Sequence, residues 1–191
     1  MENQSDSILL IAVGCGAINC ANSIIRMEEE RKAESVMNKI AVYHDKCIKA
    51  TFVGNRILIL RVNGDYEVKT LLEPYVRNVN VAIVLATLGG ITGSFVTPKI
   101  GKFLHEKGIT VLSVVTTPFH FEGEKRTLRA IKCIEEISEY SSTLIRFNFD
   151  TMSEDPDVSA SDAFRRMDKK LIETVFSIHE AYKRHSCKEI L

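Results

Sequence analysis

Two glycine-bearing segments constrain the fold of this chain most, because each follows an apolar, strand-like run and opens a helical pattern. The first reads SILLIAVGCGAINCANSII and the second reads VAIVLATLGGITGSFVTPKIGKFL. Glycines in such a turn let the backbone approach an anion closely, and the helix N-terminus adds free N–H groups and the positive end of its dipole. One such loop could equally be a tight strand–helix turn. Two on one sheet predict a ligand with several phosphates, which is typical of a nucleotide.

Strand-like runs alternate with helical patterns along most of the chain. The expected strands are Ser7–Val13, Lys39–Tyr43, Arg56–Arg61, Val81–Ala86, Thr110–Thr116 and Thr143–Phe147. The expected helices are Asn19–Asn38, Val68–Val76, Pro98–Lys107 and Lys125–Tyr140. Continuous apolar runs favour strands that are covered on both faces. The pattern predicts an α/β fold: a Rossmann-like, doubly wound, mostly parallel sheet of about six strands with helices on both faces, which binds ligands at the carboxyl ends of its strands.

A long helix closes the chain. Residues 151–158 are polar and form a connector, and residues 159–185 carry the helical pattern, with Ser159 as N-cap and Asp162 three residues later. One apolar stripe follows at steps of three and four: Phe164, Met167, Leu171, Val175, Ile178 and Tyr182. With 191 residues, we expect a single domain over residues 1–191.

Charge and cysteine content narrow the class of protein. Lys+Arg and Asp+Glu balance at 25 each, so the chain has no basic field for nucleic acid or an anionic membrane. The apolar run Ile8–Val13 is too short to span a bilayer. The five cysteines lack the spacing of a disulfide framework or of a metal site. They therefore indicate reduced thiols in a cytoplasmic protein that binds no metal.

Four motifs in order resemble the GTPase domain of the FtsZ/tubulin superfamily. The run VVTTPFHFEGEKR resembles the VVTKPFxFEGxKR segment of FtsZ, and GGITGSFVTP resembles its GGGTGTGAAP phosphate signature. The first loop, VGCGAINCAN, resembles VGGGGNNAVN, and DAFRRMDKKL resembles the purine-side helix DAFREADNVL. Together they cover nearly the whole chain. The resemblance implies binding of GTP and GDP, with which Mg²⁺ can associate, and hydrolysis completed between neighbours in a filament.

The resemblance also implies a set of nucleotide-binding residues. Residues matching the two phosphate loops are Gly14, Cys15, Gly16, Asn19, Gly89, Gly90, Thr92, Gly93 and Ser94. Asp45 matches a residue in a turn beside the nucleotide, and Thr116 matches the threonine at the end of the fifth strand. Glu122 matches the acid that binds the ribose, and Arg126 matches the basic residue near the sugar and phosphates. Phe164 matches the aromatic residue that stacks on guanine, and Asp168 matches the acid that accepts hydrogen bonds from the guanine N–H groups.

Spacing supports part of this set and leaves a plainer interpretation open. Phe164 and Asp168 are four apart, so they share one side of a helix, and a ring beside a carboxylate suits the adjacent N–H donors of guanine. Phe164 also lies on the apolar stripe. Glu122 and Arg126, likewise four apart, would otherwise be an ordinary surface pair.

Departures from the family pattern add apolar bulk around the nucleotide. Ile91 and Phe95 replace signature glycines, and Phe149 replaces a base-side asparagine. In the family, the long helix leads into a catalytic loop and a second domain, which the 191 residues do not include. We therefore expect no catalytic residue in this chain and negligible GTP turnover by the chain alone. We also expect it to cap or regulate filaments of a full-length FtsZ-like protein, or to contact another copy of itself head to tail.

Two other functions are compatible with the sequence. One is a nucleotide-free interaction scaffold with an FtsZ-like fold, which Ile91, Phe95 and Phe149 favour. The other is a Rossmann-type dinucleotide enzyme, since Gly14-x-Gly16 and the later Asp45 fit part of that fingerprint. The dinucleotide hypothesis leaves the second glycine loop and the FEGEKR segment unexplained.

Overall fold

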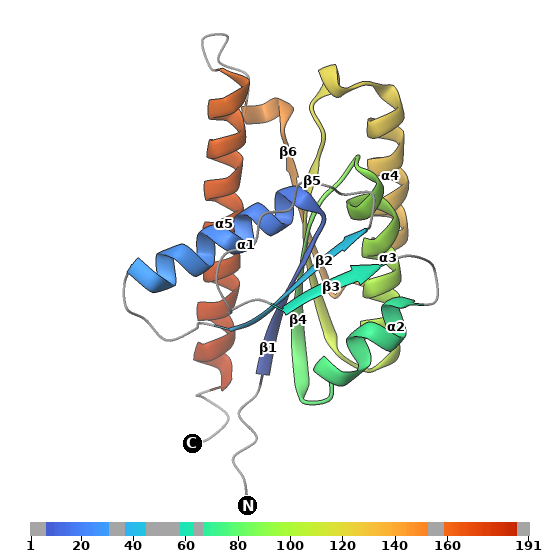
Figure 1. Ribbon diagram of the computed structural model, residues 1–191, viewed down its shortest axis with the longest axis vertical. Helices are drawn as coiled ribbons and strands as arrows, with labels where there is room; N and C mark the ends of the chain where they lie inside the picture. Colours follow the sequence, from blue (N-terminus) through green and yellow to red (C-terminus); the bar gives the residue numbers. More distant parts are fainter. Residues whose placement is uncertain (1–6, 31–36, 45–57, 63–66, 153–158, 187–191) are drawn as a thin grey trace, which may run out of the picture.

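Six parallel strands form the centre of the molecule (Figure 1). In the order β3-β2-β1-β4-β5-β6 they are Leu58–Val62, Asn38–His44, Ser7–Val13, Val79–Thr87, Thr110–Thr117 and Thr143–Asn148. The computed structural model describes residues 7–30, 37–44, 58–62, 67–152 and 159–186. The strand order reverses direction at β1, next to β4, and this is where open α/β sheets place their ligands.

Helices cover both faces of the sheet. The helices α1 (Cys15–Glu30) and α5 (Ala160–Ser186) lie on one face, and α2 (Glu67–Leu72), α3 (Ile91–Glu106) and α4 (Glu124–Ser138) lie on the other (Figure 1). Short 3₁₀ turns are η1 (Glu73–Tyr75), η2 (His120–Glu122) and η3 (Asp150–Met152). Each layer encloses its own hydrophobic core, because strand side chains alternate between the two faces.

The predicted doubly wound, parallel α/β sheet is confirmed, and the strand bounds differ from prediction by only a few residues. Two helices begin earlier than predicted: α1 at Cys15 rather than Asn19, and α3 at Ile91 rather than Pro98. Pro98 lies inside α3, in its second turn. The ladder of α3 already begins with the Ser94 N–H on the Gly90 carbonyl, so Pro98 removes one interior i→i−4 hydrogen bond, and packing on the sheet keeps the segment helical. The glycine loops therefore end at the helix starts, and part of each predicted loop is helical.

The long helix α5 is capped much as predicted. The Asp162 N–H donates to Ser159 Oγ at 3.1 Å, and the Ser159 hydroxyl donates to Asp162 Oδ2 at 2.7 Å. Met167, Leu171 and Val175 of its apolar stripe are fully buried. Most of the predicted connector, residues 153–158, lies outside the described residues.

The two glycine loops pack directly on each other and on the end of β4. A methyl group on Gly93 would lie 2.0 Å from the carbonyl oxygen of Thr87, and one on Gly16 would lie 2.7 Å from the Thr87 side chain. One on Gly14, whose φ of +84° also favours glycine, would lie 3.3 Å from Gly93 N. These glycines are therefore needed for the fold itself, because they let α1 and α3 begin beside the same strand end.

We expect Gly93→Ala to destabilise the protein by about 3 kcal/mol, because the new methyl group would displace backbone rather than a flexible side chain. Gly90→Ala is the matched control, since nothing lies within 4 Å of its added methyl group and its backbone is extended. The control should change stability by less than about 0.5 kcal/mol. Urea unfolding measures both, and equal stabilities of the two variants would contradict this close packing of Gly93 on Thr87.

Candidate functional site

A pocket of about 480 Å³ opens at the carboxyl ends of β1 and β4. It lies where α1 and α3 begin, and it extends to η2, α4 and the first turns of α5. Its lining residues are Gly14, Cys15, Gly16, Asn19, Thr87, Leu88, Gly90, Ile91, Thr92, Gly93, Glu122, Arg126, Phe149, Phe164 and Asp168. Residues from five separate segments of the chain therefore meet at one place, which is the position expected of a ligand site in this fold.

Most of the predicted site residues line this pocket. Those that do are Gly14, Cys15, Gly16, Asn19, Gly90, Thr92, Gly93, Glu122, Arg126, Phe164 and Asp168. Gly89, Ser94 and Thr116 lie outside its lining, and Asp45 lies outside the described residues. Thr87 and Leu88 line the pocket without having been predicted. Their position directly before Gly89 is the sequence signal that would have found them.

The predicted residues outside the lining have structural contacts. The hydroxyl oxygen of Ser94 accepts a hydrogen bond from the Gly89 N–H at 2.8 Å, which holds the turn before α3. Thr116 is fully buried, and its hydroxyl has no hydrogen-bond partner among the described residues. The Thr116 carbonyl accepts from the Leu88 N–H at 3.0 Å. Their contact with a ligand stays a prediction.

The glycine side of the pocket is suited to anions. The N-cap of α3 is Gly90, which supplies no side-chain cap, and neither α1 nor α3 has an acidic residue in its first turn. The first N–H groups of a helix have no partner within the helix, and they carry the positive end of its dipole. Two such helix ends border one cavity here, so its glycine side favours negative charge.

Glu122 and Arg126 form a hydrogen-bonded pair at the edge of the pocket. The Arg126 guanidinium donates to Glu122 Oε2, and the Phe119 N–H donates to Glu122 Oε1 at 3.0 Å. The Arg126 side chain is half exposed, whereas that of Glu122 is mostly covered. Glu122 is thus fixed in place by the backbone before η2, while Arg126 retains N–H groups that can face an anion.

Aromatic rings cluster beside the α5 wall of the pocket. Phe119 is fully buried and lies 4.7 Å from Phe149 and 5.1 Å from Phe164 between ring centroids. Phe149 and Phe164 meet edge to face at 5.1 Å. Phe149 is 5% exposed and Phe164 is 43% exposed, so Phe149 is part of the core and Phe164 keeps a surface for a ligand.

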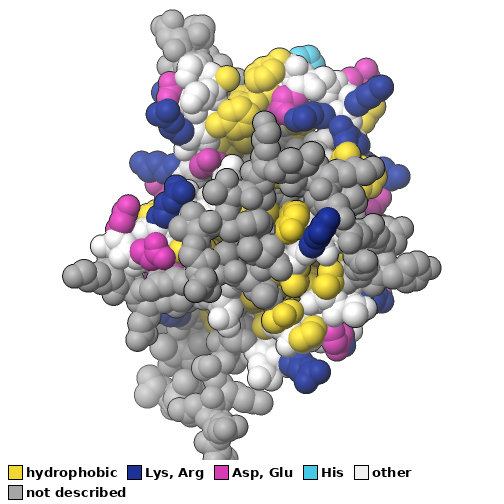
Figure 2. Space-filling view, in the orientation of Figure 1, with side chains coloured by type: hydrophobic (Ala, Val, Ile, Leu, Met, Phe, Trp, Pro, Cys, Tyr) yellow, Lys and Arg dark blue, Asp and Glu magenta, His cyan; other side chains and the backbone are white. Residues whose placement is uncertain are grey.

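Hydrophobic side chains also gather on the outside of this end of the molecule. Figure 2 shows them at the upper end, where the strands of Figure 1 finish. Phe95 at the start of α3 and Phe121 in η2 are 53% and 69% exposed. Ile91, one turn before Phe95, is 49% exposed and lines the pocket mouth.

Asp168 is the carboxylate on the α5 wall of the pocket. Burial raises the pKa of the Asp168 carboxyl above its ordinary value, and a hydrogen bond from Cys20 opposes that rise. The Cys20 thiol, fully buried in α1, donates to Asp168 Oδ1 at 3.3 Å. Sequence reasoning did not single out Cys20, although its spacing of four from Gly16 places it on the same side of α1.

The prediction that every cysteine is a reduced thiol is wrong for Cys15, which is disulfide-bonded. Cys20 and Cys133 are free and buried. Within the described residues, no group of three or more His, Cys, Asp or Glu side chains is arranged to hold a metal ion. None of the described helices is both long enough and apolar enough to cross a membrane.

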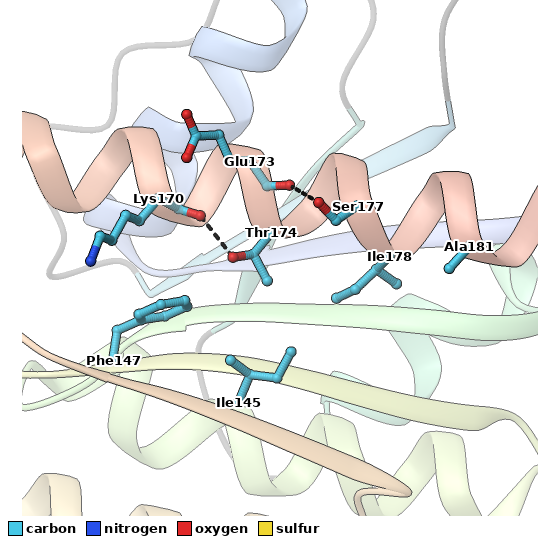
Figure 3. A pocket seen from close by; sticks show the side chains of 8 residues that line it. All are labelled: Ile145, Phe147, Lys170, Glu173, Thr174, Ser177, Ile178 and Ala181. Carbon is cyan, nitrogen blue, oxygen red and sulfur yellow. Dashed lines mark hydrogen bonds between the residues drawn. The ribbon is translucent and has the colours of Figure 1, made fainter.

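A second cavity, of about 500 Å³, lies between α5 and the edge strand β6 (Figure 3). Phe147 and Ile145 of β6 face Thr174 and Ile178 of α5 across it. Its hydroxyl groups are bonded within the helix, since Thr174 donates to the Lys170 carbonyl and Ser177 to the Glu173 carbonyl, both at 2.8 Å. This groove contains none of the predicted site residues.

Comparison with known proteins identifies relatives of this chain. Residues 65–156 match the model of the Tubulin/FtsZ family, GTPase domain. A cell division protein FtsZ from Aquifex aeolicus is 32% identical over 109 residues, which are 56% of this chain and 30% of that protein. The predicted resemblance to the FtsZ/tubulin superfamily is confirmed.

Solved structures show the same fold. An FtsZ dimer from M. jannaschii superposes with a TM-score of 0.75 at 19% identity, covering 94% of this chain and 56% of the other. CetZ2 from Haloferax volcanii, solved as a protofilament with GTPγS bound, superposes with a TM-score of 0.70 at 16% identity, covering 92% and 58%. The chain spans less than two thirds of the length of these relatives.

Phe149 and Phe164 both contact Phe119 but differ in burial, and this difference predicts how much each ring contributes to stability. Phe149→Ala should destabilise the protein by about 3 kcal/mol, because it removes a core ring that contacts both Phe119 and Phe164. Phe164→Ala should cost about 1 kcal/mol, because much of that ring is already in water. Urea unfolding of both variants tests this, and a greater loss for Phe164→Ala would reverse the assignment of core and ligand surface.

Proposed function

Because this chain is a relative of FtsZ and tubulin with the fold of their N-terminal GTPase domain, we propose that it binds GTP and GDP in the pocket at the ends of β1 and β4. The observation that carries the proposal is the pairing of two features in one cavity. Two helix N-termini without acidic residues border its glycine side, and Phe164 and Asp168 border the opposite side.

The phosphates would lie against the starts of α1 and α3. A methyl group on Gly90 would meet nothing within 4 Å, so this part of the loop leaves room for a bound group. Arg126 adds a cation at the rim. Mg²⁺ bound with GTP would be held mainly by phosphate oxygens and water, since the described residues form no carboxylate cluster for it.

The base would lie on the α5 side. The exposed part of Phe164 can stack on a purine ring, and the Asp168 carboxylate can accept hydrogen bonds from the N1–H and N2–H groups of guanine. Adenine has an unprotonated N1 and no 2-amino group, so it offers no donor there. Phe149 stands where the family resemblance implies an asparagine, so guanine selection would depend on Asp168.

An interaction scaffold that binds no nucleotide is the second candidate. Ile91 favours it, because this exposed apolar side chain lines the pocket where the family signature has glycine. The neighbouring exposed Phe95 adds to an apolar surface suited to a protein partner.

Titration calorimetry separates the candidates. GDP and GTP should bind with a dissociation constant on the order of micromolar, and ATP and NAD should not bind measurably. Asp168→Ala should weaken GDP binding by about tenfold to a hundredfold, the range for hydrogen bonds to a charged group. Glu173→Ala is the control, because this exposed carboxylate lies on the same helix outside the pocket and should leave affinity unchanged. No heat with either guanine nucleotide would favour the scaffold.

Turnover is a separate part of the proposal. Both carboxylates that line the pocket are engaged, Glu122 with Phe119 N–H and Arg126, and Asp168 with Cys20. No other acidic side chain lines the pocket within the described residues, so no carboxylate there is poised to orient an attacking water. We propose that residues 1–191 bind GTP without hydrolysing it appreciably, and that their nucleotide face caps filaments of a full-length FtsZ-like protein or contacts another copy head to tail.

A polypeptide of residues 1–191 should therefore release phosphate from GTP at a rate near the uncatalysed background. Added in equimolar amount to polymerising full-length FtsZ, it should lower light scattering, because a polypeptide that occupies a filament end without recruiting the next subunit stops growth there. Phosphate release by 1–191 at the rate of full-length FtsZ would refute the turnover proposal. Unchanged scattering would refute the capping proposal and leave nucleotide binding standing.

A further inference from the structure

A buried thiol lies directly behind the carboxylate that faces the pocket. Cys20 Sγ is 3.3 Å from Asp168 Oδ1, and Cys20 is fully buried, whereas Asp168 lines the cavity. The two residues come from α1 and α5, which cover the same face of the sheet (Figure 1). Their hydrogen bond therefore joins the helix that starts at the first glycine loop to the helix that carries the base-side residues.

The thiol is the donor in this hydrogen bond. Burial, and then the charge of Asp168, raise the pKa of the Cys20 thiol far above its ordinary value, so the sulfur keeps its proton at neutral pH. The other described residues form no hydrogen bond or ion pair with Asp168. A carboxylate offers about four acceptor sites, so one S–H donor on Oδ1 leaves room for two N–H donors of a base.

The charged side chains near Asp168 do not take the place of the Cys20 thiol as its hydrogen-bond partner. Glu122 and Arg126 are the other charged side chains among the described residues that line the pocket with Asp168, and Arg165 and Lys169 are charged neighbours of Asp168 on α5. Glu122 pairs with Arg126, and Arg165 and Lys169 reach toward acidic neighbours on α5. The influences on the pKa of Asp168 are burial, which raises it, and the Cys20 hydrogen bond, which lowers it.

We propose that Cys20 is a positioning residue for purine recognition, whose thiol holds the Asp168 carboxylate in place and in its charged form for the two N–H donors of guanine. This inference rests on the proposed binding of guanine nucleotide in this pocket. Cys20 acts through Asp168, since it is not part of the pocket lining. A protonated Asp168 loses one acceptor oxygen, so recognition of two donors depends on keeping it ionised.

The pH dependence of nucleotide affinity tests the role of Cys20. Removing the thiol in Cys20→Ala leaves burial unopposed, which raises the pKa of Asp168, so GDP affinity should begin to fall at a higher pH than in the unaltered chain. The loss relative to the unaltered chain should be larger at acidic pH than at pH 8, because Asp168 protonates more readily in Cys20→Ala. Cys20→Ser keeps a donor and should restore most of the affinity.

Inosine diphosphate isolates the contact with Asp168 from titration of the phosphates. It lacks the 2-amino group but keeps the N1–H and the same phosphates as GDP, so the ratio of GDP to IDP affinity reports the contact of the 2-amino group with the carboxylate. That ratio should fall in Cys20→Ala and recover in Cys20→Ser. Cys133→Ala is the matched control, since it removes a buried free thiol from the opposite layer and should leave the ratio unchanged.

A measurement without nucleotide keeps the inference testable if a variant binds weakly. Carbon-detected NMR of labelled aspartate, with the Asp168 signal assigned by its loss in Asp168→Asn, should give a higher pKa for Asp168 in Cys20→Ala than in the unaltered chain. Equal Asp168 titrations together with superimposable GDP profiles would overturn the role of Cys20 alone. Absence of GDP binding by the unaltered chain, at any pH, would overturn the proposed function and the recognition role of Cys20 with it.

Discussion

Gly93 lies so close to the carbonyl oxygen of Thr87 that no side chain fits between them, and the geometry of the pocket depends on this contact. Any side chain at Gly93 would push α3 away from the end of β4, and Gly16 holds α1 against the same threonine in the same way. The starts of both helices are fixed by one strand end. The glycines thus first serve the packing of protein on protein, and the anion-binding character of the pocket follows from where that packing leaves the helix ends.

The two sides of the pocket differ in how their polar groups are used. On the glycine side, backbone N–H groups at the helix starts carry the positive character, and side chains contribute little. On the other side, each carboxylate is already hydrogen-bonded by the protein, Glu122 at its backbone turn and Asp168 at Cys20. These hydrogen bonds fix the orientation and the charge of each carboxylate before a ligand binds, which suits a role in ligand recognition. The proposal of binding without turnover rests on the same hydrogen bonds, since they already engage both described carboxylates that line the pocket.

The sequence predicted the sheet well because its strands are continuous apolar runs, and it predicted much of the pocket because glycine loops follow two of them. It placed the start of α3 too late, since glycine, threonine and Pro98 are poor helix formers and only packing on the sheet reveals that they are helical. Thr116 illustrates a different limit: a residue at a strand end can lie just beneath a pocket without lining it. The bond between Cys20 and Asp168 joins residues 148 apart in sequence, and no local pattern encodes it.

The helices that begin at the pocket belong to opposite layers of the molecule, α1 to the layer of α5 and α3 to the layer of α2 and α4. Folding therefore brings two like helix dipole ends together across a sheet, an arrangement that is electrostatically unfavourable in itself. A polyanion bound between them would relieve this repulsion and fasten one hydrophobic core to the other. Such a ligand would act as a cross-brace, raising the unfolding temperature of both layers together as its concentration rises.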